Sequence, residues 1–263
     1  MNNLFRIVAI LLLLLPFQVT KAEEGNLNVA LLGDSMTWIG GDNFEKPLGW
    51  AYYITDLPLN LRTYARSGAT WTNTRQTKAD TKAYSELLDP QNVIYNQALR
   101  LIDDRNFQPD VIIIYAGTND AWFSAKRPGI FDDFTPPDGK PAHVFKPSDF
   151  TSLEGSIWLV NSLLLESFPD ARIYLVTPAK SGKISDESIS RVSEIIETAG
   201  AETGASVVRG DALFGFSHKD EAAKPFRFTY DGVHTNEKGA RRIADCIKSN
   251  ILLPELVSIN NRQ

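Results

Sequence analysis

Short apolar runs alternate with longer amphipathic segments along most of the chain. The runs have the length of β-strands and fall at residues 27–32, 61–65, 110–117, 172–177 and 205–208. The third run is apolar almost throughout, which is typical of a parallel strand whose sheet is covered by helices on both faces. The pattern therefore predicts a doubly wound, three-layer α/β/α sandwich around a mostly parallel, five-stranded sheet.

Four helices are expected around these strands. The first covers about 89–104 and opens with Asp-Pro, a capping residue followed by proline at the first helical position. The second begins at Ser148, the third covers 186–203, and the last begins near Asn236 and carries an apolar stripe. In sandwiches of this kind the reactive groups lie beyond the carboxyl ends of the strands.

The N-terminal segment has a different character. Residues 1–22 contain an early cation, Arg6, then an apolar run and small residues near the end of the segment. The run is about a dozen residues long, too short to span a bilayer, and has the proportions of a signal-peptide core. We expect residues 1–22 to be a signal peptide and 23–263 to form one exported domain, periplasmic or extracellular, without stable membrane insertion. A membrane-anchoring helix is the alternative.

Charge and cysteine content narrow the classes of function. Without Arg6 and Lys21, 25 basic and 32 acidic side chains remain, a net charge of −7. An acidic chain without clustered cations argues against a nucleic-acid partner. The single cysteine, Cys246, excludes an intramolecular disulfide and a cysteine-based zinc site. His143 and His218 have no metal ligand at suitable spacing, so we predict neither a metal site nor a cofactor.

Small polar residues follow three of the predicted strands. Gly33-Asp34-Ser35 follows the first, Ser67-Gly68 the second and Gly117-Thr118-Asn119-Asp120 the third. A fourth segment, Asp231-Gly232-Val233-His234, precedes the last helix. Each segment alone is more often a turn or a helix cap. Together they are expected on one rim of the sheet, and this coincidence favours a functional site.

These segments hold the groups that acyl transfer requires. Ser35 offers a hydroxyl nucleophile, His234 can accept its proton, and Asp231 lies close enough to orient the imidazole. Gly68, which has no Cβ, can bring its backbone N–H near a substrate oxygen, and Asn119 offers a side-chain amide. Asp34 and Asp120 are expected to bond loop amides instead.

In this order, the four segments resemble those of the SGNH hydrolases, also called the GDSL family. The resemblance covers nearly all of the chain after residue 22 and implies a flavodoxin-like SGNH hydrolase fold. It also implies a serine esterase with Ser35 as nucleophile, His234 as base and Asp231 as its partner, and an oxyanion hole formed by Ser35, Gly68 and Asn119. The second segment departs from the family's commoner Asn-x-Gly form, since Ala65 and Arg66 precede Ser67-Gly68.

Three tryptophans bear on the substrate. Trp38, Trp71 and Trp122 each lie three residues after a predicted site residue. They are expected either to line a pocket for a sugar ring or an acyl chain, or only to anchor the loops. An exported acidic enzyme with such a pocket fits deacetylation of a small-molecule or polysaccharide ester. A lysophospholipase or thioesterase, and a non-catalytic carbohydrate-binding module on the same fold, are the alternatives. The oligomeric state is left open.

One long segment interrupts the alternation of strands and helices. Residues 123–147 hold five prolines and several aromatic residues, among them Phe131, Phe134 and Phe145. Loops of this length are commonly functional or disordered, and the aromatic content favours a flap packed against the body of the protein.

Overall fold

The computed structural model describes residues 26–72, 93–127 and 129–260. Its strands are β1 (Leu27–Gly33), β2 (Leu59–Thr63), β3 (Val111–Tyr115), β4 (Arg172–Val176) and β5 (Ser206–Val208). Its α-helices are α1 (Ser35–Trp38), α3 (Ile94–Asp103), α4 (Thr118–Phe123), α5 (Leu153–Ser167), α6 (Asp186–Thr203), α7 (Gly210–Leu213), α8 (His218–Glu221), α9 (Glu237–Ile247) and α10 (Leu253–Asn260). A short 3-10 helix, η1 (Trp50–Ile54), precedes β2, and a π-helical segment, η6 (Lys248–Leu252), joins α9 to α10. The predicted signal peptide and the predicted helix start at 89–92 lie outside the described residues.

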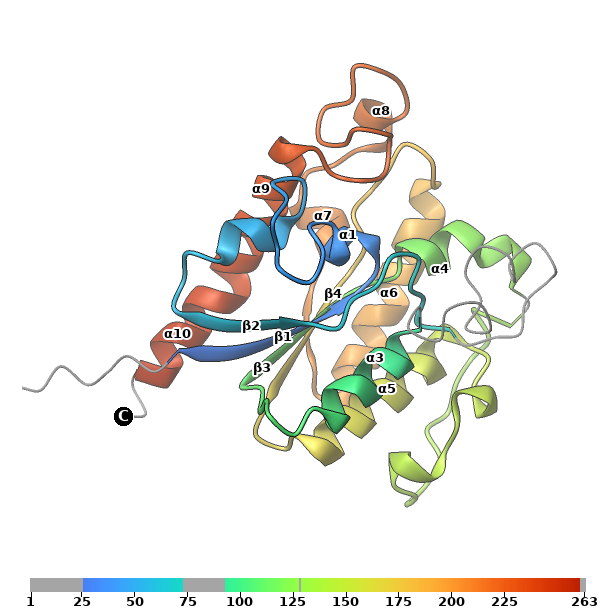
Figure 1. Ribbon diagram of the computed structural model, residues 1–263. Helices are drawn as coiled ribbons and strands as arrows, with labels where there is room; N and C mark the ends of the chain where they lie inside the picture. Colours follow the sequence, from blue (N-terminus) through green and yellow to red (C-terminus); the bar gives the residue numbers. More distant parts are fainter. Residues whose placement is uncertain (1–25, 73–92, 128, 261–263) are drawn as a thin grey trace, which may run out of the picture.

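The five strands form one parallel sheet in the order β2-β1-β3-β4-β5 (Figure 1). In its register, Leu31 of β1 lies beside Thr63 of β2 and Ile113 of β3. Helices cover both faces, so the predicted α/β/α sandwich is confirmed. This flavodoxin-like order reverses direction between β1 and β3, and groups that follow these two strands therefore meet at the switch point.

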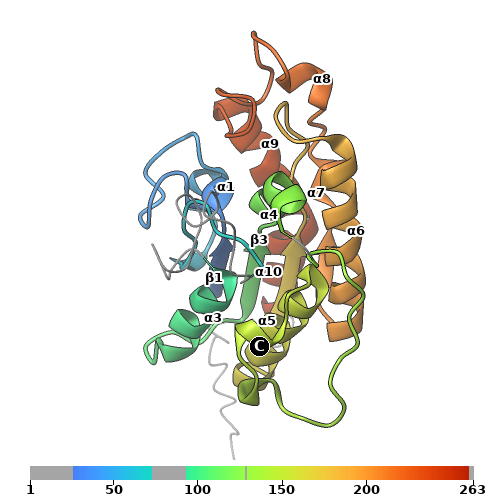
Figure 2. The ribbon, with the colours of Figure 1, turned by 90° about the vertical axis from the view of Figure 1, so that its right-hand side faces the viewer.

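Alternate side chains of β3 belong to two hydrophobic cores. Ile112 and Ile114 lie in a core closed by α3, α5 and α6, which pack side by side on one face (Figures 1 and 2). Val111, Ile113 and Tyr115 lie in a second core closed by η1, α9 and η6. Because both faces are covered, all five residues of β3 are buried, which explains the continuous apolar run in the sequence.

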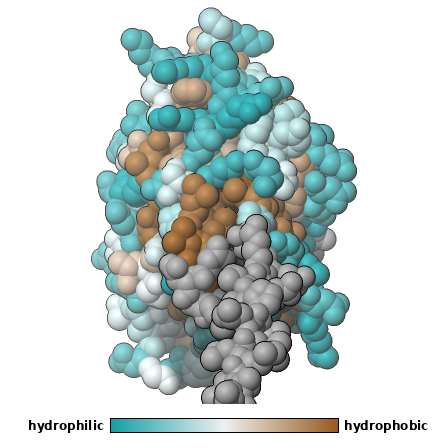
Figure 3. Space-filling model, turned by 90° about the vertical axis from the view of Figure 1, so that its left-hand side faces the viewer, coloured by the Kyte–Doolittle hydropathy of each residue, from teal (hydrophilic) through white to brown (hydrophobic). Residues whose placement is uncertain are grey.

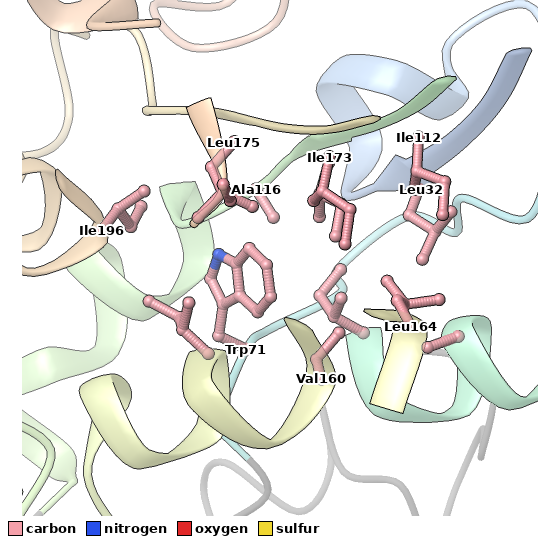
Figure 4. Packing of buried hydrophobic residues seen from close by; sticks show 14 of the residues in the cluster. Leu32, Trp71, Ile112, Ala116, Val160, Leu164, Ile173, Leu175 and Ile196 are labelled. Carbon is pink, nitrogen blue, oxygen red and sulfur yellow. The ribbon is translucent and has the colours of Figure 1, made fainter. Parts of the chain in front are cut away.

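Trp71 lies inside the first of these cores. Its side chain is 1% exposed and sits between Ala116 and Leu175 of the sheet layer and Val160 and Ile196 of the helices (Figure 4). The expectation that Trp71 lines a substrate pocket is therefore wrong. The ring anchors the segment that follows β2 by burial, and no surface of it remains for a ligand.

Most predicted boundaries hold to within a few residues. The bounds of α6 are those expected, and Asn236 caps α9 through its side chain, which accepts a hydrogen bond from the Gly239 N–H. The second helix begins later than predicted, at Leu153 instead of Ser148. Residues 147–149 form a separate 3-10 turn, and Ser152 provides the cap by accepting a hydrogen bond from the Gly155 N–H.

The aromatic residues of the long segment 123–147 are packed, as expected. Phe134 and Phe145 form a cluster with Phe150 and Trp158, with ring centroids 5.5–5.9 Å apart. Phe131 packs against the first core. The segment is thereby held against α5 by side-chain burial despite its lack of long regular elements.

The face that carries the edge strand β2 and the C-terminal helix α10 has hydrophobic side chains near its centre (Figure 3). Leu253 and Val257 are the exposed apolar side chains that α10 contributes to the surface, at 46% and 61% exposure. Across residues 26–72, 93–127 and 129–260, no helix has both the length and the apolar character needed to cross a membrane.

The burial of Trp71 makes a quantitative prediction. Trp71→Ala should lower the free energy of unfolding by about 3–5 kcal/mol, because it leaves a large cavity in a closed core. Urea denaturation measures the change. Trp122→Ala, which removes the same side chain from a position that is 37% exposed, is the matched control and should cost far less. Similar losses in the two variants would contradict the assignment of Trp71 to the core.

Candidate active site

The turn that presents Ser35 is fixed by backbone geometry at the end of β1. Gly33 has φ +151°, and a Cβ at this position would lie 2.2 Å from the Tyr115 carbonyl oxygen, so only glycine fits. Asp34 then caps α1, its Oδ1 accepting a hydrogen bond of 2.9 Å from the Met36 N–H. Ser35 follows as the first residue of α1 and is 9% exposed.

A buried glutamine on α3 holds the same turn from the side. Gln97 Oε1 accepts a hydrogen bond of 2.8 Å from the Gly33 N–H, and its Nε2 donates one of 2.9 Å to the Gly33 carbonyl oxygen. Gln97 is not among the residues predicted from the sequence. The available signal was an amide side chain on the buried face of an amphipathic helix, between Ile94 and Leu101, where a polar group needs a partner.

Both oxygens of the Asp231 carboxylate form hydrogen bonds with His234. Oδ1 accepts hydrogen bonds from the Val233 and His234 N–H groups, at 2.9 and 2.7 Å, and Oδ2 lies 2.8 Å from His234 Nδ1. Burial acts to raise the pKa of Asp231, but the hydrogen bonds from His234 and from the two amides outweigh it and lower the pKa below its usual value. An ionised carboxylate here places the ring proton on Nδ1.

His234 Nε2 then faces Ser35. The distance from Nε2 to Ser35 Oγ is 3.0 Å, although the two residues are 199 positions apart in the chain. Since Nδ1 donates to Asp231, Nε2 carries a lone pair and accepts the hydroxyl hydrogen of Ser35. The structure therefore joins the three side chains that the sequence analysis had selected into one hydrogen-bonded series.

The segment that carries Asp231 and His234 is supported by a buried acid. Glu221 accepts hydrogen bonds from the Phe228 and Thr229 N–H groups, at 2.8 and 3.1 Å, and from Thr229 Oγ1. Thr229 Oγ1 accepts in turn from the Gly232 N–H at 3.0 Å. Glu221 is fully buried, yet in the sequence nothing distinguishes it from neighbouring surface acids, so it was not selected.

Gly68 and Asn119 lie beside the end of β1. Gly68 has φ +78° in the turn after β2, and this turn is tied to β1 because the Arg66 N–H donates to the Gly33 carbonyl oxygen at 3.1 Å. Asn119 Nδ2 donates to the Ala69 carbonyl oxygen at 2.9 Å. An amide nitrogen carries two hydrogens, so Asn119 retains a second one to donate. Figures 1 and 2 show α1 and α4, which carry Ser35 and Asn119, beyond the same end of the sheet.

Asp34 and Asp120 bond loop amides, as expected. Asp120 accepts hydrogen bonds from the Trp71 and Thr72 N–H groups, at 3.0 and 3.2 Å, and from Thr72 Oγ1 at 2.8 Å. Its carboxylate also lies 3.4 Å from Arg127 Nη1, and both side chains are fully buried. Within the described ranges, no group of three or more His, Cys, Asp and Glu side chains could hold a metal ion.

Two of the three predicted tryptophans are at the surface. Trp38 and Trp122 are each 37% exposed, on the helices that carry Ser35 and Asn119. Asp42 accepts hydrogen bonds from Trp38 Nε1 at 3.3 Å and from the Arg66 guanidinium at 2.9 Å, which connects the segments that follow β1 and β2.

A parallel α/β/α sandwich with these four segments at one rim of its sheet is the architecture of the chain. Residues 31–242 match the model of the GDSL-like lipase/acylhydrolase family, and the chain belongs to that family. The match spans all four segments described above.

Solved structures share the fold of this chain. A protein described as a GDSL-like lipase, from Bacteroides uniformis ATCC 8492, is 20% identical, with a TM-score of 0.55 over 87% of this chain and 96% of its own. An acetylxylan esterase from Geobacillus stearothermophilus, solved as a catalytic mutant, is 18% identical, with a TM-score of 0.51 over 86% of this chain and 95% of its own. At such identities the likeness extends to the fold alone. A search of curated proteins gave no match.

The buried Asp34 predicts a specific pH dependence of stability. Burial raises the pKa of Asp34 to about 6, against lowering contributions from the Met36 amide, Thr118 and His234. A carboxyl group whose pKa is higher in the folded than in the unfolded state stays protonated to a higher pH in the folded protein. The contribution of Asp34 to stability therefore falls as the pH rises from about 4 to about 6.

Asp34→Asn cannot ionise and should not show this fall. The difference in unfolding free energy between wild type and variant should therefore shift in favour of the variant by up to about 3 kcal/mol between pH 4 and pH 7. Urea denaturation of both proteins at the two pH values measures the shift, and other titrating groups cancel in the comparison. A difference independent of pH would contradict it.

Proposed function

We propose that the protein is an exported serine esterase that hydrolyses a carboxylic ester, with a carbohydrate acetyl ester as its substrate. One observation carries the proposal. Ser35 Oγ, the His234 imidazole and the Asp231 carboxylate form a hydrogen-bonded series at distances of 3.0 and 2.8 Å. This is the arrangement with which serine hydrolases activate a hydroxyl group.

The reaction follows from the direction of these hydrogen bonds. Ser35 Oγ attacks the ester carbonyl carbon while its proton passes to His234 Nε2. The developing oxyanion accepts hydrogen bonds from the Ser35 and Gly68 N–H groups and from the Asn119 amide. Collapse of this intermediate breaks the bond to the alcohol, which takes the proton from His234. Water then attacks the acyl-enzyme and gives a proton to the same nitrogen. The bond between Ser35 Oγ and the acyl carbon breaks, His234 returns the proton to Oγ, and the acid leaves.

Asp231 keeps the imidazole in the orientation and tautomer that this sequence needs. The hydrogen bonds that lower its pKa keep the carboxylate ionised at neutral pH, so it also stabilises the imidazolium that forms in each step. Loss of such a partner or of one oxyanion donor typically raises the barrier by about 3–5 kcal/mol.

The proposed substrate class rests on the surroundings of Ser35. Trp38 and Trp122 keep more than a third of their surface exposed on the helices that carry Ser35 and Asn119, and exposed aromatic rings suit the apolar faces of sugars. The fold likeness to an acetylxylan esterase and the signal-peptide character of residues 1–22 are consistent with an exported enzyme acting on acetylated carbohydrate.

The assignment of the nucleophile is tested by Ser35→Ala. Turnover of p-nitrophenyl acetate should fall by about a thousandfold or more, because the variant lacks the hydroxyl that forms the acyl-enzyme. The melting temperature should stay nearly unchanged, since the substitution removes one hydroxyl from a small side chain. Ser249→Ala, at an exposed serine on η6, is the matched control and should keep full activity.

Covalent labelling supplies a second readout for the same pair of variants. A fluorophosphonate should label the wild type and Ser249→Ala, but not Ser35→Ala. A protein that neither hydrolyses the ester nor takes the label, yet binds acetylated oligosaccharide, would be a binding module on this fold. Full activity in Ser35→Ala would also overturn the proposal.

The preference for an acetyl group is tested with p-nitrophenyl esters of increasing acyl-chain length. The value of kcat/KM should fall at least roughly tenfold from acetyl to octanoyl, because a site fitted to an acetyl group excludes the longer chain, and a misfit of even one methylene discriminates on that scale. Acetate should be released from acetylated xylan, and little fatty acid from a lysophospholipid. Faster release of the long-chain acid would identify a lipid hydrolase in place of a carbohydrate esterase.

A further inference from the structure

A third exposed aromatic residue lies on the segments that carry the candidate active site. Tyr230, which directly precedes Asp231, is 50% exposed. Trp38 and Trp122 are each 37% exposed on the helices of Ser35 and Asn119. Single exposed aromatic residues are common, but one on each of three converging site segments indicates a surface that contacts a ligand.

The ring of Tyr230 lies against the imidazole of His234. The two ring planes are within 18° of parallel and their centroids are 5.9 Å apart, an offset stack. The backbone fixes this arrangement independently of the side chain, because the Tyr230 N–H donates to the His234 carbonyl oxygen at 2.9 Å. Glu221 holds the residues just before it. The phenol therefore lies beside the imidazole, and half of its surface remains exposed.

The position of Tyr230 beside His234 places it on the alcohol side of the ester bond that is broken. In the proposed reaction His234 returns its proton to the departing alcohol, so the alcohol must leave beside the imidazole. A ring stacked on that imidazole lies next to the alcohol and not next to the acyl group, which is bonded to Ser35. Resting on the proposed function, we propose that Tyr230 forms the leaving-group subsite, where its exposed surface stacks on the sugar that carries the ester.

A purely structural role of the ring would have different consequences. The position of His234 is set by its bonds to Asp231 through Nδ1 and through its own N–H. Neither bond involves the phenol. Removing the ring should therefore leave the chemistry on a small alcohol intact and weaken only the binding of a sugar.

The experiment compares two substrates that share the acetyl group and differ in the alcohol. Methyl acetate has no sugar, whereas a monoacetylated methyl xyloside presents one. For Tyr230→Ala, kcat/KM on the xyloside should fall roughly three- to tenfold, which is the contribution expected of one aromatic stacking contact. The loss should appear as an increase in KM. On methyl acetate the kinetics should be those of the wild type. Tyr230→Phe keeps the ring and should restore the xyloside reaction.

Tyr52→Ala is the matched control, since it removes a 42% exposed tyrosine from η1, outside the four site segments, and should leave both reactions unchanged. Equal losses on both substrates with Tyr230→Ala would make Tyr230 a positioning residue and overturn the subsite. Wild-type kinetics on both substrates would overturn it as well. A wild type that hydrolyses neither ester would instead refute the proposed function, and the subsite with it.

Discussion

The hydrogen bond between the Asp231 carboxylate and His234 Nδ1 is the interaction on which the candidate site depends. It fixes the protonated nitrogen of the ring, and only then does Nε2 have a lone pair to offer Ser35 at 3.0 Å. The same carboxylate also accepts hydrogen bonds from the N–H groups of residues 233 and 234. It therefore orients both the backbone and the side chain of His234. Three residues of separation are sufficient because the chain turns back on itself between the acid and the imidazole.

The two halves of the site are stabilised by different means. Ser35 and Asn119 follow neighbouring strands of the sheet, and the turn before Ser35 is further held by Gln97 from α3. The segment of Asp231 and His234 belongs to no strand, and it depends on a buried acid, Glu221, that satisfies its amides. Both supporting groups are polar side chains enclosed by the protein, where each unpaired partner would be costly.

The sheet and the four segments of the candidate site could be predicted because their signals are local. A strand buried on both faces reads as a continuous apolar run, and strand ends of a parallel sheet share one edge. Other features depend on tertiary packing. The spacing that selected Trp71 does not reveal that its ring turns into the core, and Ser148 and Ser152 are equally good caps until the turn at 147–149 is known. Gln97 and Glu221 accept hydrogen bonds from backbone groups of other segments, and the sequence around them does not indicate which groups these are.

The contact between Gly33 and the Tyr115 carbonyl oxygen has a dynamic consequence. Since not even a methyl group fits between the ends of β1 and β3, these two strand ends must move as one body. Ser35 and Asn119 lie within a few residues of that contact, one after each strand. Motion of the sheet therefore displaces Ser35 and Asn119 together, so the distance between them changes less than it would for groups on independent loops.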